Sequence, residues 1–152
     1  MEIIEEIKIG SQIWMKNNLC VRTYNNGDPI DYVNGPIEWN EKIITQQESI
    51  CSSVNYNPYN DRIYGCLYSW KTVNDDRGLA PDGWRIPSNK DIIELKQFLG
   101  NDSTKIKSKH GWRENDYVPD SNLNDSAHFT ARPAGMIFSD GQYDDLGNYA
   151  YF

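Results

Sequence analysis

The chain has 152 residues, a formal net charge of −7 and 38% apolar residues. This length is typical of one domain, so we expect a single domain over residues 1–152. The acidic balance argues against nucleic acid as a partner, because phosphate binding needs clustered Lys and Arg. The densest basic stretch, Lys105–Arg113, is short and is expected to be a solvated turn. No run of about 18 apolar residues occurs, so we predict no membrane span.

The N-terminal segment predicts a β-hairpin. Residues 5–9 and 12–15 alternate apolar and polar side chains on either side of Gly10-Ser11, a pair typical of a type II′ turn. Ahead of them, Met1–Ile7 carries acids where a signal peptide needs Lys or Arg, so no signal peptide is visible.

The next part of the chain is dominated by turn-forming residues. Tyr24–Pro29 contains Asn, Gly, Asp and Pro and is expected to be a loop. Residues 31–61 show only weak periodicity. We therefore expect a long surface connection there, with one helical turn at 39–43.

Residues 62–73 predict a first helix. Their apolar side chains recur at the spacing of one helical face, at Ile63, Cys66, Leu67 and Trp70. Gly65 weakens this pattern, because glycine disfavours helix interiors. We expect Cys66 to be a small core residue on this helix.

Residues 88–99 predict a second, better-defined helix. Ser88 is the expected N-cap, Asp91 stands at the capping-box position, and Gly100 can end the helix. The apolar stripe consists of Ile92, Leu95 and Leu99.

The C-terminal part contains three strand-like pieces, at residues 128–131, 135–138 and 148–152. With the two helices, they predict an α+β domain in which the helices pack on a mainly antiparallel, twisted sheet.

The cysteines and histidines indicate no metal site and no catalytic residue. Cys20, Cys51 and Cys66 are widely spaced, so a zinc site is not favoured. Their odd number excludes a full disulfide framework; one bridge is allowed, and we favour three reduced thiols. Neither His110 nor His128 stands in a recognisable catalytic frame, and we predict no cofactor.

Three aspartates and an asparagine near the C-terminus could supply oxygen atoms to calcium. The group comprises Asp140, Asp144, Asp145 and Asn148. Its spacing is not that of an EF-hand, so we interpret these residues as turn formers.

Aromatic residues are the strongest candidates for ligand contact. Trp14, Trp70 and Trp84 lie in patterned segments and are expected in the core. Loop aromatics either pin the loop or contact a ligand. The candidate ligand-binding residues are therefore Trp39, Trp112, Tyr117 and Tyr143.

Several motifs follow one another in a characteristic order. They are Ile9–Leu19, Tyr24–Ile30, Tyr64–Trp70, Val73–Leu79, Pro81–Pro87, Phe129–Gly135 and Leu146–Phe152. Together they resemble the Fibrobacter succinogenes major paralogous domain, a branch of the C-type-lectin-like fold. The resemblance implies that fold and a role in display and binding. Its members are typical of surface-exposed proteins of anaerobic gut-type bacteria, with similar modules in their phages.

Two segments, Ile86–Ile92 and Gly141–Asn148, also resemble the formylglycine-generating branch of the same fold. The catalytic cysteines of that branch have no counterpart here, so this resemblance implies the fold and not the activity.

Two departures from the family pattern lead to further expectations. Family members often carry Cys at the position of Ala80, so Cys51 lacks that partner. The family also usually continues beyond Phe152 with strands that complete the sheet. We therefore expect a domain without its closing strands. Either another chain supplies that edge, or the edge stays open, or the sequence is part of a longer protein. Because an open edge favours aggregation, we favour pairing of residues 148–152 with another polypeptide.

These observations predict a non-enzymatic, surface-displayed recognition or adhesion module that binds a glycan or protein receptor. One alternative is a structural component of a phage virion or surface appendage. Another is a degenerate formylglycine-generating-type oxidase. The expected location is a virion or extracellular surface.

Overall fold

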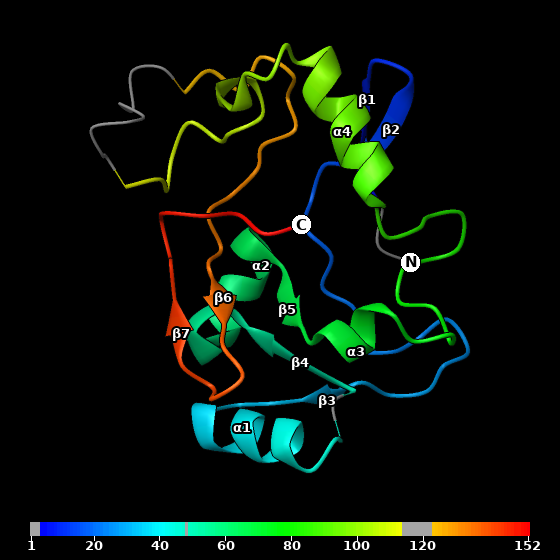
Figure 1. Cartoon of the computed structure of the whole chain (residues 1–152), viewed down its shortest axis with the longest axis vertical. Coiled ribbons are helices and arrows are strands. Elements are labelled where there is room, and N and C mark those ends of the chain that lie inside the picture. The colour runs from blue at the N-terminus through cyan, green and yellow to red at the C-terminus, as the bar shows by residue number, and fades with distance from the viewer. Residues whose placement is uncertain (1–3, 48, 114–122) are drawn as a thin grey trace. The chain divides into compact units, whose positions relative to one another are not determined.

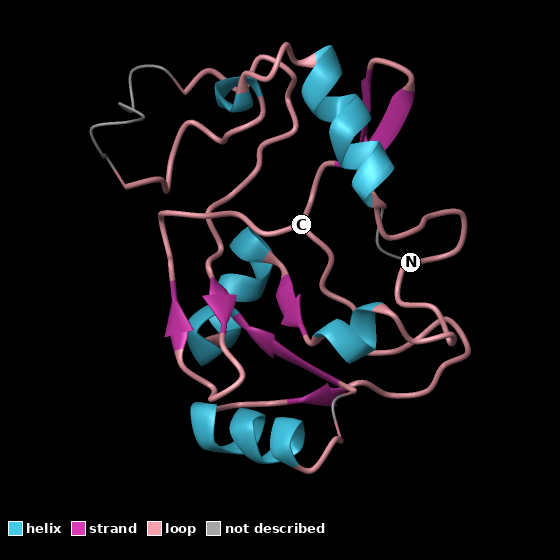
Figure 2. Cartoon of the chain, viewed as in Figure 1, coloured by secondary structure: helices cyan, strands magenta, loops and turns pink. Residues whose placement is uncertain are grey.

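A computed structural model describes residues 4–47, 49–113 and 123–152. The chain is of the mixed α+β class, with short helices and strands separated by long loops (Figures 1 and 2). It divides into two compact units that interleave along the sequence. Unit 1 comprises Met1–Asn18, Pro87–Ala134 and Leu146–Phe152, and unit 2 comprises Leu19–Ile86 and Gly135–Asp145. That the whole chain is one domain stays a prediction.

Unit 1 begins with the predicted hairpin. Strands β1 (Glu6–Ile9) and β2 (Gln12–Met15) are antiparallel, with Ile7 opposite Trp14. The chain reverses at Gly10, whose φ of 62° is readily adopted only by glycine. The hairpin prediction is confirmed.

Helix α4 (Asn89–Phe98) is the second predicted helix, and its ends follow the sequence signals. The Ser88 Oγ accepts a hydrogen bond from the Asp91 N–H, and the Asp91 carboxylate accepts one from the Ser88 N–H at 2.7 Å. Gly100 has a φ of 70°, and the Asn101 N–H donates to the Lys96 carbonyl at 2.8 Å. This is a Schellman ending.

Removing the N-cap should destabilise unit 1. Ser88→Ala leaves an N–H at the start of α4 without its side-chain acceptor. We expect a loss of about 1 kcal/mol in the free energy of unfolding, measured by urea denaturation. Gln97→Ala, at an exposed position of the same helix, is the control and should change stability much less. An equal loss in the two variants would contradict the capping role.

The core of unit 1 lies where the hairpin and α4 contact residues 129–131. Its buried residues are Ile9, Leu95, Leu99, Phe129 and Ala131. A short 3-10 helix, Ser103–Lys105, follows α4. The predicted strands at 128–131 and 148–152 are absent: Ala131 forms one isolated bridge with Lys107, and residues 148–152 lie in no strand. The pairing of residues 148–152 with another polypeptide stays a prediction.

Unit 2 is built around a three-stranded sheet. Its strands are β3 (Asp31–Tyr32), β4 (Ile50–Ser53) and β5 (Cys66–Tyr68), with β4 parallel to β3 and antiparallel to β5. All four residues of β4 are fully buried. Their polar groups are satisfied, since Ser52 Oγ donates to the Val33 carbonyl at 2.6 Å and the Ile50 N–H donates to Thr72 Oγ1 at 2.9 Å.

Helix α1 (Pro36–Ile44) lies between β3 and β4 along the chain and is longer than the single predicted turn. Pro36 opens it, a position that tolerates proline because the first N–H groups of a helix have no partner. The helix buries Trp39 against Val33 and Ile50. After β4 come two 3-10 turns, Val54–Tyr56 and Pro58–Asn60.

The predicted helix at 62–73 is wrong. Helix α2 (Asp61–Tyr64) ends at Gly65, whose φ of 72° and ψ of −164° lie outside the helical region. The chain then pairs with β4 as β5, and Ser69 caps a new short helix, α3 (Trp70–Val73). Trp70 is consequently 79% exposed and not in the core.

A last hairpin, β6 (Met136–Ile137) and β7 (Tyr143–Asp144), belongs to unit 2. Three of the four described strand pairs are antiparallel, as predicted. The strands form three small sheets, where the sequence predicts one. Within residues 4–47, 49–113 and 123–152, no helix has the length and apolar character needed to cross a membrane.

Candidate functional site

Unit 1 contains a pocket of about 500 Å³. Ten of its fifteen lining residues are apolar, a composition typical of ligand sites. The apolar lining residues are Trp14, Ile92, Leu95, Leu99, Ile106, Trp112, Phe129, Ala131, Ala150 and Phe152. The pocket therefore lies against the core of unit 1, beside α4.

Three aromatic rings form one wall of this pocket. Phe129 contacts Trp14 and Phe152 edge to face, with ring centroids 5.6 and 5.7 Å apart. The indole N–H of Trp14 donates to Gln12 Oε1 at 3.2 Å. These contacts fix the Trp14 ring and leave its surface as an apolar wall.

Lys107 and Trp112 form a second, mixed part of the lining. The Lys107 ammonium lies 4.4 Å from the centroid of the Trp112 ring, a cation–π contact. Lys107 is half-buried, and burial lowers the pKa of its ammonium group. Within the described part of the chain, the buried indole N–H of Trp112 has no hydrogen-bond partner.

Backbone hydrogen bonds position these two side chains. The Ala131 N–H donates to the Ile106 carbonyl at 2.7 Å, and the Ser108 N–H donates to the Ala131 carbonyl at 2.9 Å, so both neighbours of Lys107 are held. The Arg113 N–H donates to the Gly147 carbonyl at 2.7 Å, which holds the residue after Trp112. The interpretation of 105–113 as a solvated turn holds for the exposed residues 109–111 but is wrong for 106–108, because their backbone joins the core segment.

Lys96 and Asp102 are the other charged residues of the lining. The Asp102 carboxylate already accepts hydrogen bonds from the Thr104 N–H at 3.0 Å and hydroxyl at 2.6 Å, which lower its pKa. Among the described residues, neither Lys96 nor Lys107 has a carboxylate within 4 Å. The pocket thus presents two ammonium groups without an acidic partner.

The structure brings one of the four predicted ligand-binding residues to this pocket, namely Trp112. Trp39 lies on α1 and not in a loop, and it is 3% exposed; its role as a ligand contact stays a prediction. Tyr143 lies on β7 of unit 2, outside this pocket, and Tyr117 lies outside the described residues. Of the tryptophans predicted in the core, Trp14 and Trp84 are half-buried.

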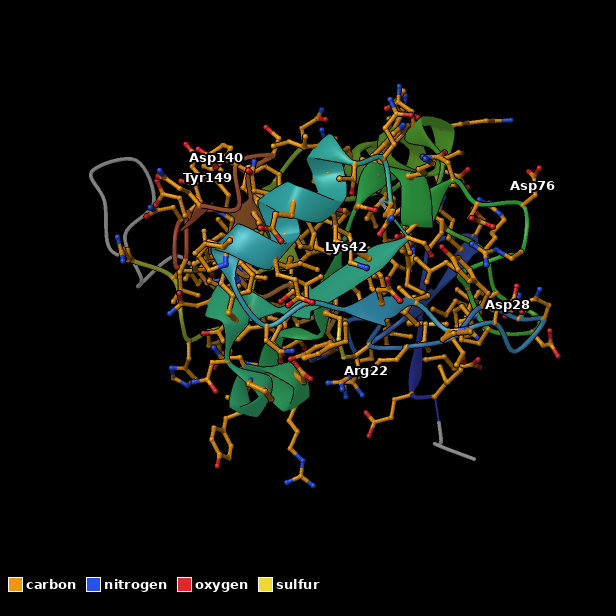
Figure 3. All side chains as sticks on the ribbon, turned by 90° about the horizontal axis from the view of Figure 1, so that it is seen from below. Arg22, Asp28, Lys42, Asp76, Asp140 and Tyr149 are labelled. Carbon is orange, nitrogen blue, oxygen red and sulfur yellow. A yellow bond between two sulfur atoms is a disulfide. The ribbon has the colours of Figure 1, made fainter. Side chains whose placement is uncertain are left out.

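Unit 2 carries a separate charged cluster that joins two loops. Asp28 lies on the loop that includes Tyr24. Arg77 lies on the neighbouring loop, which also carries Asp76 (Figure 3). The Arg77 guanidinium donates two hydrogen bonds to Asp75, both at 2.8 Å, and one to Asp28 at 3.1 Å. It also lies 4.1 Å from the centroid of the Tyr24 ring. Arg77 thus contacts the other three side chains, so we interpret the cluster as a structural link.

This cluster should make unit 2 sensitive to acid. Hydrogen bonds from Arg77 hold the pKa of Asp75 well below its usual range. A carboxyl whose pKa is lower in the folded state contributes stability above its unfolded pKa of about 4, and that contribution is lost as the pH falls. Asp75→Asn should therefore reduce the loss of stability between about pH 6 and about pH 3.

The measurement is the urea midpoint of wild type and variant at both pH values. Asp76→Asn, at an exposed neighbouring position, is the control and should retain the wild-type pH dependence. If Asp75→Asn and wild type lose stability in parallel, the assigned role of Asp75 is refuted.

Cys20 and Cys66 form a disulfide in unit 2, with their Cα atoms 4.6 Å apart. The preference for three reduced thiols is thus wrong. The reason is spatial: β5 runs beside the segment at Leu19, where the Cys66 N–H donates to the Leu19 carbonyl at 2.9 Å. Asp61 lies beside this pair, its carboxylate oxygen within 4.8 Å of both sulfurs. That carboxylate pairs with Arg22 at 3.0 Å.

Cys51 is a free thiol that is fully buried in β4. Burial raises the pKa of this thiol to about 11. A nucleophilic cysteine needs the opposite shift, toward the thiolate. Cys51 therefore has the environment of a core residue.

The acids considered for calcium make local turn contacts. Asp140 Oδ1 accepts a hydrogen bond from the Gln142 N–H at 2.9 Å, and Asp144 Oδ1 accepts one from the Asp145 N–H at 2.7 Å. Both contacts are of the kind that short acidic side chains make in turns.

Among known proteins, neither a curated protein nor a solved structure matches the chain. The model of one family, the Fibrobacter succinogenes major domain, matches residues 7–152. The match spans both units and all the motifs that carry the resemblance. The chain therefore belongs to the Fibrobacter succinogenes major domain family.

Proposed function

We propose that this protein is a recognition module without enzymatic activity, which binds a glycan or protein receptor at the pocket of unit 1. The observation that carries this proposal is the pocket itself: about 500 Å³ are surrounded by an aromatic wall and by two ammonium groups that have no acidic partner among the described residues. Aromatic walls of this kind give a ligand apolar contact area, and charged groups fix its orientation.

The state of the cysteines supports a non-enzymatic role. An oxidase of the formylglycine-generating type needs a reactive cysteine pair. Cys20 and Cys66 are bonded to each other, and the thiol of Cys51 is buried, with its pKa raised. We also propose that the α+β arrangement is a C-type-lectin-like fold, for which a hairpin, a helix and further short strands are suitable elements.

Display on a virion or an extracellular surface is part of the same proposal. A disulfide in unit 2 favours an oxidising location over a reducing one. A virion or appendage component is the alternative role, and it differs in that the isolated protein would bind no receptor.

The test is a binding screen of the full chain against a glycan array and a panel of purified surface proteins. We expect a specific ligand whose binding is weakened by Trp112→Ala at least tenfold, as for an aromatic contact residue, about 1.4 kcal/mol. Trp70→Ala is the matched control, because Trp70 is 79% exposed and belongs to unit 2. Binding that is lost in Trp70→Ala and kept in Trp112→Ala would contradict the proposal.

A further inference from the structure

The lining of the pocket suits a large apolar side chain, and its volume leaves room for the residues next to that side chain. Its volume of about 500 Å³ lies in the range of ordinary ligand sites, and its walls are aromatic and aliphatic. Burial of an aromatic or leucine side chain against Trp14, Phe129 and Leu95 removes apolar surface from water on both partners. A neutral sugar carries hydroxyl groups around its ring, and these would lose hydrogen bonds to water against such walls.

The charge at this pocket is opposite to the charge of the whole chain. The formal net charge is −7, yet the lining contains Lys96 and Lys107 against the single acid Asp102. The Asp102 carboxylate is already engaged by Thr104. Lys107 is half-buried against Trp112 and has no carboxylate partner among the described residues. A carboxylate on the ligand would supply that partner.

Building on the proposed function, we propose that the receptor is a protein, and that unit 1 binds a segment of it in which a large apolar side chain stands next to an acidic one. The apolar side chain occupies the pocket between α4 and the aromatic wall. The acidic side chain accepts hydrogen bonds from Lys107, and Lys96, which also lines the pocket, adds long-range attraction. A salt-dependent affinity follows, since exposed charges are screened.

The experiment measures fluorescence anisotropy of labelled, capped peptides with the full chain. One peptide has the sequence Gly-Phe-Asp-Gly, the second replaces Asp with Asn, and the third replaces Phe with Gly. We expect the first to bind about tenfold more tightly than either of the others, as for one charge-assisted hydrogen bond or one buried aromatic ring. Raising NaCl from about 0.05 M to about 0.5 M should weaken the Asp peptide only.

Two lysine variants test whether Lys107 is the residue that contacts the acidic side chain of the peptide. Lys107→Gln should abolish the preference for Asp over Asn, while Lys90→Gln, an exposed lysine of α4 outside the pocket, should keep it. Equal affinity for the Asp and Asn peptides, or a preference unchanged in Lys107→Gln, would overturn the inference. A labelled uronic-acid oligosaccharide is measured in the same assay, as a ligand that carries carboxylates but no peptide.

The outcomes separate this inference from the proposed function. An oligosaccharide that binds more tightly than the peptides, and is weakened by Trp112→Ala, refutes the protein segment and leaves the recognition role in place. If Trp112→Ala leaves the binding of every ligand unchanged, both the protein-segment inference and the proposed function are refuted.

Discussion

Gly141→Ala should destabilise unit 2 by about 3 kcal/mol or more, among the largest effects expected of a single substitution. Gly141 is buried at the turn between β6 and β7, with a φ of 85°. A Cβ atom there would lie 2.1 Å from the Pro36 carbonyl oxygen, at the start of α1. Because the clashing atom belongs to the backbone, relief requires that α1 or the hairpin move.

The backbone of Gly141 also contributes a contact. Its carbonyl accepts a hydrogen bond from the Tyr56 hydroxyl at 2.6 Å, and burial raises the pKa of that hydroxyl to about 12. Movement of the turn would break this bond as well. The effect is measured as the shift in the urea midpoint, with far-UV circular dichroism as a check on folding.

Gly27→Ala is the control that measures the cost of the left-handed backbone conformation without the clash. Gly27 has a φ of 88°, similar to that of Gly141, but a Cβ atom there would meet no atom within 4 Å. We expect a loss of only about 1–2 kcal/mol, the usual cost of a left-handed conformation for a residue with a side chain. Equal losses in the two variants would show that the approach of Gly141 to Pro36 does not matter.

Loss of the disulfide should destabilise unit 2 by about 4 kcal/mol, the loop-entropy value for a closed loop of this length. The two cysteines are 46 residues apart and enclose β3, α1, β4 and α2. The double variant Cys20→Ala/Cys66→Ala should therefore unfold at a much lower urea concentration than the wild type. Reduction of the wild type with dithiothreitol should produce the same shift.

The control is the double variant itself, whose midpoint should not respond to dithiothreitol. Cys51 provides an internal reference, because its buried thiol should stay unlabelled by a thiol reagent until the protein unfolds. A wild-type midpoint that is unchanged by complete reduction would be incompatible with a stabilising bridge.

The elements that the sequence predicts correctly depend on local signals. The hairpin follows from Gly10 and the alternation around it, and α4 follows from Ser88, Asp91 and Gly100. In each case the residues that start or stop the element lie within it or next to it, so no distant contact decides the outcome.

The elements that the sequence misses depend on distant partners. Strand β4 has two serines among its four residues, and it is buried because Val33 and Thr72 satisfy its polar groups. The apolar spacing at 62–73 indicates a helix, but Gly65 breaks it and pairing with β4 makes residues 66–68 a strand. Propensity is a weak prior wherever tertiary contacts compete with it.

In the candidate site, too, residues marked by local signals could be predicted and residues positioned by distant contacts could not. Trp112 could be proposed as a loop aromatic, whereas Trp39, which stands between Glu38 and Asn40, is buried by α1. Lys107 could not be identified, since its half-buried position follows from a bridge to Ala131, 24 positions further along the chain by their residue numbers. An aromatic in a basic stretch, Lys105–Arg113, is the one signal that could have suggested the pair.

The most direct test of the recognition site uses the five tryptophan indole N–H resonances in a ¹⁵N spectrum of the full chain. Trp14 and Trp112 line the pocket, Trp39 is buried in unit 2, and Trp70 is exposed there. On titration with the ligand from the binding screen, we predict shifts of the Trp14 and Trp112 resonances, while those of Trp39 and Trp70 stay in place. A shift of Trp70 alone, with Trp14 and Trp112 unchanged, would contradict the assignment of the pocket as the binding site.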